Sequence, residues 1–556
     1  SKRFGDFDFS GGMAWGRLGS AAHISNPLEK ISGHFGRKRS LDGENPNEPE
    51  DWFTGADVGF FAGVEYAPPD SDFSIKADWG ADRHVRELAA IEDFNAPDPW
   101  SVSIDYHPRK WISANIGVIG GEKLMGRLTL RNLVQSWPER KTKQDIREPV
   151  YPYRSGNYNP SGLVLAAEKD NLTLSAPQRQ GEVIRTALDL RKGRSAPLQI
   201  GRTLRQASLK TGKDIEAITI IPVSKGLRGR ALTLRRSDFE NALAKNHGSP
   251  QEIWHNTDIS KTGNDHLPFA PFFKHGNFIL QQDLSLAEED QGAIGRTSLL
   301  YESESSLTKS LFLGFRTRLN LVNNLERLNA FAALNSENPV RSDIYRFANQ
   351  TTGFDRLYAS YMATPYSDLH IGFAAGYLEE IYGGFAGEVL YRPFGKTYAA
   401  GIEIADVVRR DPNAPLNCGF ENETTTTGHL NLYYELPGSP VTLEMKAGRY
   451  LAGDWGGTLG ATRHFRNGAK LRAFITATNE KDMDIFGGES NLYGGLQFAL
   501  PLDNIPHIPE GTEFRTDFSP IGRDKGQVLN SPLDLYKRSE KLSYRHMTQN
   551  WPDIME

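Results

Sequence analysis

Three short stretches of the chain concentrate the side chains that could bind or transform a ligand. The candidate residues are Arg341 and Asp343, Glu379 and Glu380, and Arg449, Asp454 and Trp455. Carboxylate and guanidinium groups hydrogen-bond hydroxyls, and an aromatic face can stack on a sugar ring. These residue types predict the binding of a hydroxyl-rich ligand. The plainer alternative is that the charges pair with one another and only stiffen the protein.

The adjacent carboxyls Glu379 and Glu380 also raise the question of glycoside hydrolysis, which needs two carboxyls about 5 to 9.5 Å apart around the bond. Neighbouring residues of a strand point to opposite faces, so we expect these two not to meet one substrate. The chain is therefore predicted to be non-enzymatic. Carboxylates from different strands keep a glycan-modifying enzyme open as an alternative.

No metal and no cofactor are expected. Cys418 is the only cysteine, and the 13 histidines show no HExxH spacing. The glycine-rich strings Gly117–Gly121 and Gly456–Gly460 lack the Gly-Lys-Ser/Thr ending of a phosphate loop. Asp6 and Asp8 alternate within a strand pattern and lack the other ligands of a calcium loop.

Composition limits the class of protein. A formal net charge of −5 leaves no positive surplus for nucleic acid, which we exclude as a partner. The 54 glycines and the 10% aromatic content favour strands and turns. No apolar run is long enough for a membrane-spanning helix, yet strands need only about 9 to 11 residues to cross a bilayer. A hydrophilic average is therefore compatible with a membrane barrel.

The elements that must carry the candidate residues are strands in which apolar and polar residues alternate. Residues 1–134 contain about six, a count too low for an ordinary outer-membrane barrel. Their apolar faces are Phe7, Phe9, Met13 and Trp15; Val58, Phe60, Ala62, Val64 and Tyr66; Phe73, Ile75, Ala77 and Trp79; Trp100, Val102, Ile104 and Tyr106; Ile112, Ala114, Ile116 and Val118; and Leu128 and Leu130. This region is predicted to be a partial N-terminal β-barrel.

Residues 135–268 follow a different pattern. Leu198–Lys210 shows the spacing of one helical face, and Ile215–Val223 with Arg230–Arg235 predicts a strand pair. Ser237 and Glu240 predict a capping box before a short helix. We expect a small periplasmic α/β module here.

Alternation returns in residues 269–520, with about twelve to sixteen strands, enough for a closed C-terminal β-barrel. Typical apolar faces are Leu369, Ile371, Phe373, Ala375 and Tyr377; Leu430, Leu432, Tyr434 and Leu436; Val441, Leu443, Met445 and Ala447; and Leu471, Ala473, Ile475 and Ala477. Residues 521–556 are expected to be a polar C-terminal tail.

A soluble β-sandwich or propeller would also alternate, because one face of each sheet is buried. The many consecutive strands and the charged second face favour a membrane barrel. Aromatic residues near strand ends, where girdles belong, agree with it. These aromatics are Trp15, Trp79, Trp100 and Tyr450.

Longer strings resemble one family, the YjbH-type (GfcD-like) exopolysaccharide proteins. The strings are Gly376–Gly395 (GYLEEIYGGFAGEVLYRPFG), Gly448–Leu459 (GRYLAGDWGGTL), Phe4–Phe9 (FGDFDF), Trp15–Leu18 (WGRL), Gly526–Asn530 (GQVLN) and Leu533–Tyr536 (LDLY). They fall in both alternating regions.

The resemblance implies two tandem outer-membrane barrels with periplasmic α/β elements between them, and a role in export of exopolysaccharide or capsule. The implied partners are a polysaccharide, outer-membrane lipids and other export proteins of the periplasm. The family has well over a hundred residues before the first strand seen here, so the first barrel is expected to be incomplete in this chain. A plugged structural scaffold is a further alternative.

Overall fold

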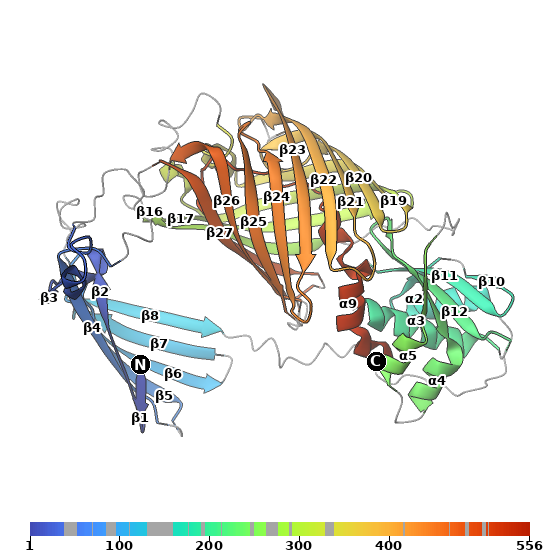
Figure 1. Ribbon diagram of the computed structural model, residues 1–556, viewed down its shortest axis with the longest axis horizontal. Coiled ribbons are helices and arrows are strands. Elements are labelled where there is room, and N and C mark those ends of the chain that lie inside the picture. Colours follow the sequence, from blue (N-terminus) through green and yellow to red (C-terminus); the bar gives the residue numbers. More distant parts are fainter. Residues whose placement is uncertain are drawn as a thin grey trace. The chain divides into compact units, whose positions relative to one another are not determined.

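The computed structural model forms two compact units, Ser1–Pro138 with Phe486–Glu489, and Glu139–Ile485 with Ser490–Glu556 (Figure 1). The residues described are 1–37, 53–68, 71–84, 96–109, 112–130, 159–175, 177–190, 195–212, 214–244, 249–262, 276–288, 292–328, 339–414, 418–465, 468–483, 489–502, 508–509 and 511–556. Strands predominate, which confirms the prediction of a mainly β protein.

The first unit is one open antiparallel sheet of eight strands, with the path β1-β2-β4-β5-β6-β7-β8 and β3 beside β4. On one face, Lys76 lies 3.1 Å from Asp105 and 3.5 Å from Glu65. Aromatic and aliphatic side chains are exposed along the sheet, as the alternation predicted. The strands are β1 (Lys2–Phe4), β2 (Phe7–Trp15), β3 (Ile24–Ser25), β4 (Asp57–Tyr66), β5 (Phe73–Trp79), β6 (Trp100–Arg109), β7 (Ile112–Ile119) and β8 (Lys123–Leu130).

The second unit begins with a mixed sheet of order β10-β11-β12-β14-β15, with helices beside it (the α/β subunit, residues 159–262). β11 and β12 are parallel, and α3 makes the crossover between them. The elements are α2 (Pro160–Lys169), β9 (Thr173–Leu174), β10 (Gln178–Gln180), β11 (Val183–Asp189), α3 (Ala196–Lys210), β12 (Ala217–Ser224), β13 (Leu227–Arg228), β14 (Ala231–Arg235), α4 (Arg236–Ala244), α5 (Pro250–His255) and β15 (Asp258–Ser260).

The predicted helical face and strand pair of this region are present. Ile200, Leu204 and Ala207 of α3 are fully buried, because their spacing places them on one face against the sheet. The predicted capping box is wrong. Helix α4 already begins at Arg236, and Glu240 pairs with that arginine one turn earlier instead of capping the helix.

The remainder of the second unit is a closed barrel of thirteen strands, within the expected range. A short helix, α7 (Ile344–Ala348), lies in the connection between the third and fourth strands. The strands are β16 (Asn277–Glu288), β17 (Gly292–Ser306), β18 (Leu311–Asn323), β19 (Thr352–Tyr366), β20 (Leu369–Tyr377), β21 (Tyr382–Tyr391), β22 (Tyr398–Arg410), β23 (Phe420–Glu435), β24 (Val441–Arg449), β25 (Trp455–His464), β26 (Lys470–Met483), β27 (Glu489–Pro501) and β28 (Glu513–Phe518).

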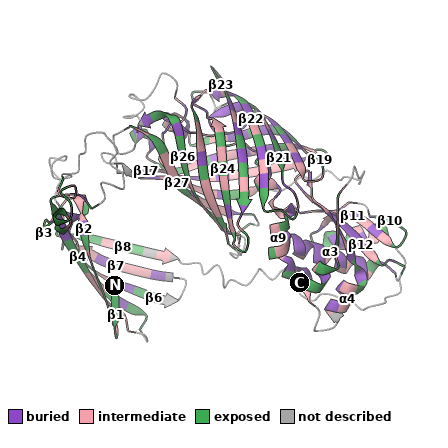
Figure 2. Cartoon of the chain, viewed as in Figure 1, coloured by how far each residue is buried: buried purple, intermediate pink, exposed green. Residues whose placement is uncertain are grey.

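The barrel wall is apolar outside and polar inside. On β23 the outward residues Leu430 and Tyr434 are exposed, whereas His429 and Asn431 are buried. The alternating exposed and buried residues are visible along the barrel strands in Figure 2. A β-sandwich would bury the apolar set instead, so the closed barrel contradicts the β-sandwich and propeller folds for this half of the chain.

The odd number of strands determines how the barrel closes. Consecutive strands are antiparallel, so the first and the thirteenth run in the same direction, and β16 pairs with β28 in parallel from Ile279↔Glu513 to Leu284↔Phe518. The chain therefore enters the barrel at one end and leaves it at the other. We call the end whose turns meet the α/β subunit the near end and the opposite one the far end.

Within the described ranges, no helix combines the length and apolar character needed to cross a membrane.

Candidate functional site

The lumen of the barrel is occupied by the residues that follow β28, which we call the return segment (residues 519–556). It hydrogen-bonds to inward side chains of β17, β19, β21 and β23, and also of β26 and β27 on the other side of the wall. A segment that touches inward residues on both sides of a closed wall must lie inside it. Its helices are α8 (Leu535–Arg538) and α9 (Tyr544–Gln549).

At the far end, carboxylates hold the start of the return segment. Oδ1 of Asp524 accepts hydrogen bonds from the backbone N–H groups of Val340, Arg341 and Ser342, at 2.7 to 2.9 Å. Oδ2 of Asp482 on β26 in turn accepts from the N–H of Asp524 at 2.6 Å. Charge-assisted bonds to a carboxylate are the stronger kind, so the far turn and the return segment are fixed to each other.

Towards the near end of the lumen the return segment is held by an ion pair and by ring stacking. Arg538 contacts both carboxylate oxygens of Glu304, at 3.0 and 2.7 Å, and both side chains are largely buried. The rings of Tyr536 and Tyr433 stack with centroids 3.8 Å apart. Oε2 of Glu388 accepts from the N–H of Leu535 at 2.9 Å.

At the near end the return segment enters the α/β subunit. Trp551 packs against Trp254 of α5, and its Nε1–H donates to the carbonyl of Pro250 at 2.7 Å. The N–H of Ala196, at the start of α3, donates to Nε2 of His546 at 3.3 Å. Burial lowers the pKa of His546 to about 4, so the ring is uncharged at neutral pH and can accept this bond.

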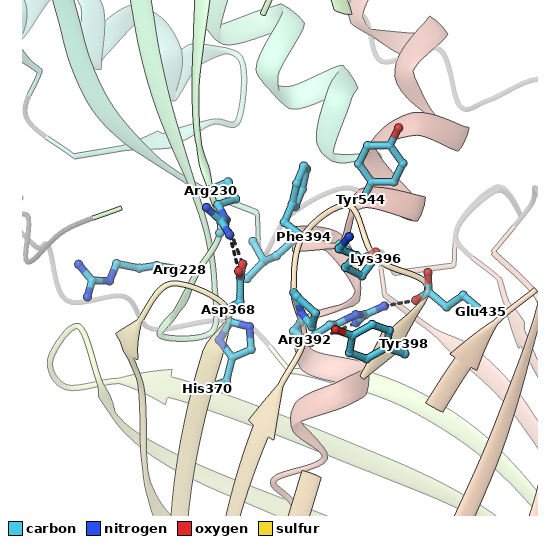
Figure 3. Close-up of a pocket in the computed structure, with 15 residues that line it drawn as sticks. Arg228, Arg230, Asp368, His370, Arg392, Phe394, Lys396, Tyr398, Glu435 and Tyr544 are labelled. Atoms are coloured by element: carbon cyan, nitrogen blue, oxygen red, sulfur yellow. Dashed lines mark hydrogen bonds and ion pairs between the residues drawn. The ribbon is translucent and has the colours of Figure 1, made fainter. Parts of the chain in front are cut away.

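A cleft marks the joint between the near end and the α/β subunit (Figure 3). Arg230 reaches from the subunit to Asp368 in the turn before β20. Arg392 pairs with Glu435 at 2.6 Å and lies over the ring of Tyr536. The Arg230–Asp368 pair is bidentate, an arrangement with a defined geometry, so it fixes the α/β subunit to the barrel. Arg392 adds a contact between the barrel and the return segment.

The structure brings four of the candidate residues together at the far end. Arg341 pairs with Glu379 at 2.9 Å, and Oε2 of Glu379 also accepts from the N–H of Asn530. Glu380 accepts hydrogen bonds from both Nη groups of Arg296, at 2.7 and 3.0 Å. Asp343 contacts Arg409, which is completely buried.

One expectation about these residues is wrong. Glu379 and Glu380 do not alternate along a strand, because they lie in the turn between β20 and β21. Both side chains are buried, and each carboxylate meets a different arginine. In a turn the two side chains need not point to opposite faces. Each carboxylate is nevertheless bound by its own arginine, so the two do not face a common substrate position.

Asp454 is separate from that group but also holds the return segment. It is fully buried, and its Oδ2 accepts from the N–H of Gly526 at 2.8 Å. Arg449 and Trp455 lie at the far rim: Arg449 donates to the carbonyl of Thr426 at 2.8 Å, and Trp455 is exposed. Roles of these seven residues in ligand binding remain predictions.

Tyr450, proposed as a girdle residue, is completely buried, and its hydroxyl is 2.8 Å from that of Thr458. Because its side chain is buried in the turn after β24, it does not lie on the outer face where a girdle residue belongs. The residues that sequence reasoning missed are those of residues 521–556, expected as a polar tail. The signal was present as apolar side chains, since Leu533, Leu535, Leu542, Met547, Trp551 and Ile554 are all buried.

A closed wall of thirteen strands, apolar outside and charged inside, with its own chain folded into the lumen, defines a β-barrel protein. The family model for the YjbH exopolysaccharide biosynthesis proteins matches residues 1–541, and the chain belongs to this family.

The chain is 26% identical over 562 residues to a protein described as the uncharacterized lipoprotein YjbH of Escherichia coli strain K12, which covers 96% of this chain and 78% of that protein. Among solved structures it is similar to Salmonella typhi OmpF in complex with daunomycin, at 10% identity and a TM-score of 0.23, over 45% of this chain and 97% of that one. That likeness is too weak to carry an inference.

The ion pair between Arg538 and Glu304 yields a prediction. Arg538→Met removes the guanidinium from the buried Glu304 carboxylate and leaves it with Lys225, 3.5 Å away, and with the Tyr358 hydroxyl. The free energy of unfolding should fall by about 3 kcal/mol, the low end of the range for a broken buried pair. Urea unfolding in detergent measures it. Lys525→Met is the matched control, because its partner Glu480 is exposed and such pairs contribute only about 0–1 kcal/mol. Equal losses in the two variants would contradict the role given to Arg538.

Proposed function

We propose that this protein is a non-enzymatic outer-membrane component that assists export or surface assembly of an exopolysaccharide. The carrying observation is the wall of the barrel, with apolar side chains exposed outside and charges enclosed within. Such a wall suits hydrocarbon outside and a polar interior. The proposal that the substrate is an exopolysaccharide rests on membership of the exopolysaccharide biosynthesis family.

The outer wall provides a test of location. Ile402 is exposed in the middle of the outward face of β22, and Tyr398 lies at its near end on the same face. If hydrocarbon surrounds the wall, Ile402→Arg should lower the free energy of unfolding in lipid by about 2–4 kcal/mol and Tyr398→Arg by about 0–1 kcal/mol. Equal, small effects in refolding titrations with lipid vesicles would argue for water at this face.

The α/β subunit is placed on the periplasmic side in this proposal, where other export proteins would contact it. Its support is the near-end joint, where Arg230 meets Asp368 and Trp551 meets Trp254. These contacts hold the subunit against one end of the barrel, so it would share one aqueous compartment with that end. A rigid joint would let an export protein that binds the α/β subunit lie at a fixed position relative to the barrel.

A glycan-modifying enzyme remains the alternative from another class. The described inward carboxylates considered for it, Glu379 and Glu380, are each engaged by an arginine. Glycoside hydrolysis needs two carboxyls that face the same bond, whereas these two are turned towards different arginines. The geometry therefore favours a structural role for these two groups.

A plugged scaffold is the second candidate, and the return segment favours it, because a sugar chain cannot share the space that this segment fills. The two candidates differ in whether the return segment must move. Tyr433→Cys with Tyr536→Cys would tie the segment to β23 through a disulfide, since the two rings are stacked. The pair Tyr434→Cys and Tyr536→Cys is the matched control, because Tyr434 faces outward.

Export assays with these variants test the proposal. In cells lacking the native copy, cell-surface exopolysaccharide should fall severalfold and be restored by this protein. The Tyr433–Tyr536 pair should restore export only after a reductant is added if glycan passes through the lumen, and without reductant if the barrel is a scaffold. Unchanged surface glycan in the deletion strain would contradict an export role, and altered polymer length at normal amounts would favour an enzyme.

A further inference from the structure

The return segment does not fill the lumen evenly. On the side of β18 and β19, the Arg318 and Asp355 side chains are only 7% and 5% exposed. On the side of β24 and β26, the Glu444 and Arg472 side chains are 23% and 28% exposed, although they also point inward and pair with each other. The Glu444–Arg472 pair is therefore more accessible to water than the Arg318–Asp355 pair.

The exposed inward charges continue towards the near end. Lys470 and Glu540 are 30% and 25% exposed, and Arg515 at the near part of β28 is similar. We call this water-accessible side of the lumen the vestibule. It is bounded by β22 to β28 and by one face of the return segment.

The return segment itself has a dry and a wet face. Leu533 and Leu535 are buried, and both lie close to Gly372 on β20. Asp534 and Lys537 are exposed on the other face. A segment that lies against one side of a wider lumen would bury one face and expose the other. The return segment shows this pattern.

The vestibule ends before the far end. The hydroxyl of Tyr493 donates to the carbonyl of Gly526 at 3.0 Å, and Asp454 accepts from the N–H of the same glycine. Tyr450 and Thr476 beside them are at most 1% exposed. The turn after β24 and the start of the return segment thus close the lumen at the far end.

The lining predicts which part of a glycan the vestibule suits. It presents the carboxylates Glu403, Glu444, Glu513, Asp517, Asp534 and Glu540 and the cations Lys446, Lys470, Arg472, Arg515 and Lys537. Paired charges keep spare lone pairs and N–H groups for hydroxyls. Because carboxylates outnumber cations among these side chains, a polyanion would be repelled.

From this lining we infer that the vestibule binds an uncharged, hydroxyl-rich stretch of glycan. This rests on the proposed function and narrows its substrate from any exopolysaccharide to an uncharged segment. The far closure would hold such a stretch until the return segment moves.

Thiol labelling of single-cysteine variants in a Cys418→Ser background tests the inference on the full chain in detergent. Lys537→Cys should react with N-ethylmaleimide at least about tenfold faster than Ser539→Cys, because the serine of the same segment is only 1% exposed. Maltoheptaose should slow the labelling of Lys537→Cys severalfold. An oligogalacturonate of matched length should slow it much less.

Equal reactivity of the two cysteines would overturn the vestibule. Lack of protection by maltoheptaose, or equal protection by the acidic oligomer, would overturn the assignment of an uncharged glycan. These outcomes are separable from the export test. If surface glycan is unchanged in the deletion strain while maltoheptaose still protects the cysteine, the proposed function fails and the vestibule stands.

Discussion

Every strand in a barrel wall must hydrogen-bond to a neighbour along both of its edges. Here thirteen strands, an odd number, satisfy this requirement by closing the wall on itself. Single-chain bacterial barrels ordinarily have an even number, which leaves both ends of the chain on one side. With thirteen strands, β28 joins β16 in parallel and the chain emerges at the far end. The end of the return segment packs against the α/β subunit, so the chain must run back from the far end to the near end. The shortest path between the two ends is through the lumen.

The inward charges are consistent with that route. Asp482, Asp454, Glu379 and Glu388 each accept a backbone N–H of the return segment, and Arg538 of the segment meets Glu304 of the wall. A buried carboxylate is costly unless it is paired and hydrogen-bonded, so these groups are stable only while the segment is in place. The wall and its contents therefore depend on each other. Movement of the segment would expose the carboxylates to water, which is the condition under which they could meet sugar hydroxyls.

Much of the fold was predictable because alternation is a local property. Leu430, Leu432 and Tyr434 identify an outward face without knowledge of any neighbour, and the same pattern brackets the number of strands. Whether that number is odd depends on β28, a strand of only six residues. The pairing of Arg341 with Glu379 could not be predicted, because it joins a turn to another turn 38 positions away. The return segment was missed because its apolar residues are interspersed with charges that face the vestibule.

The most direct test of the lumen route uses the native protein and a zero-length carbodiimide, which joins lysine to carboxylate only where they touch. Lys525 of the return segment pairs with Glu480 at the far end, and Glu540 of the same segment pairs with Lys470 at the near end. Mass spectrometry should find both links in one chain, together with the wall pair Lys446 and Glu403 as a positive control. Formation of the wall link without the Lys470–Glu540 link would contradict a segment that runs the length of the barrel.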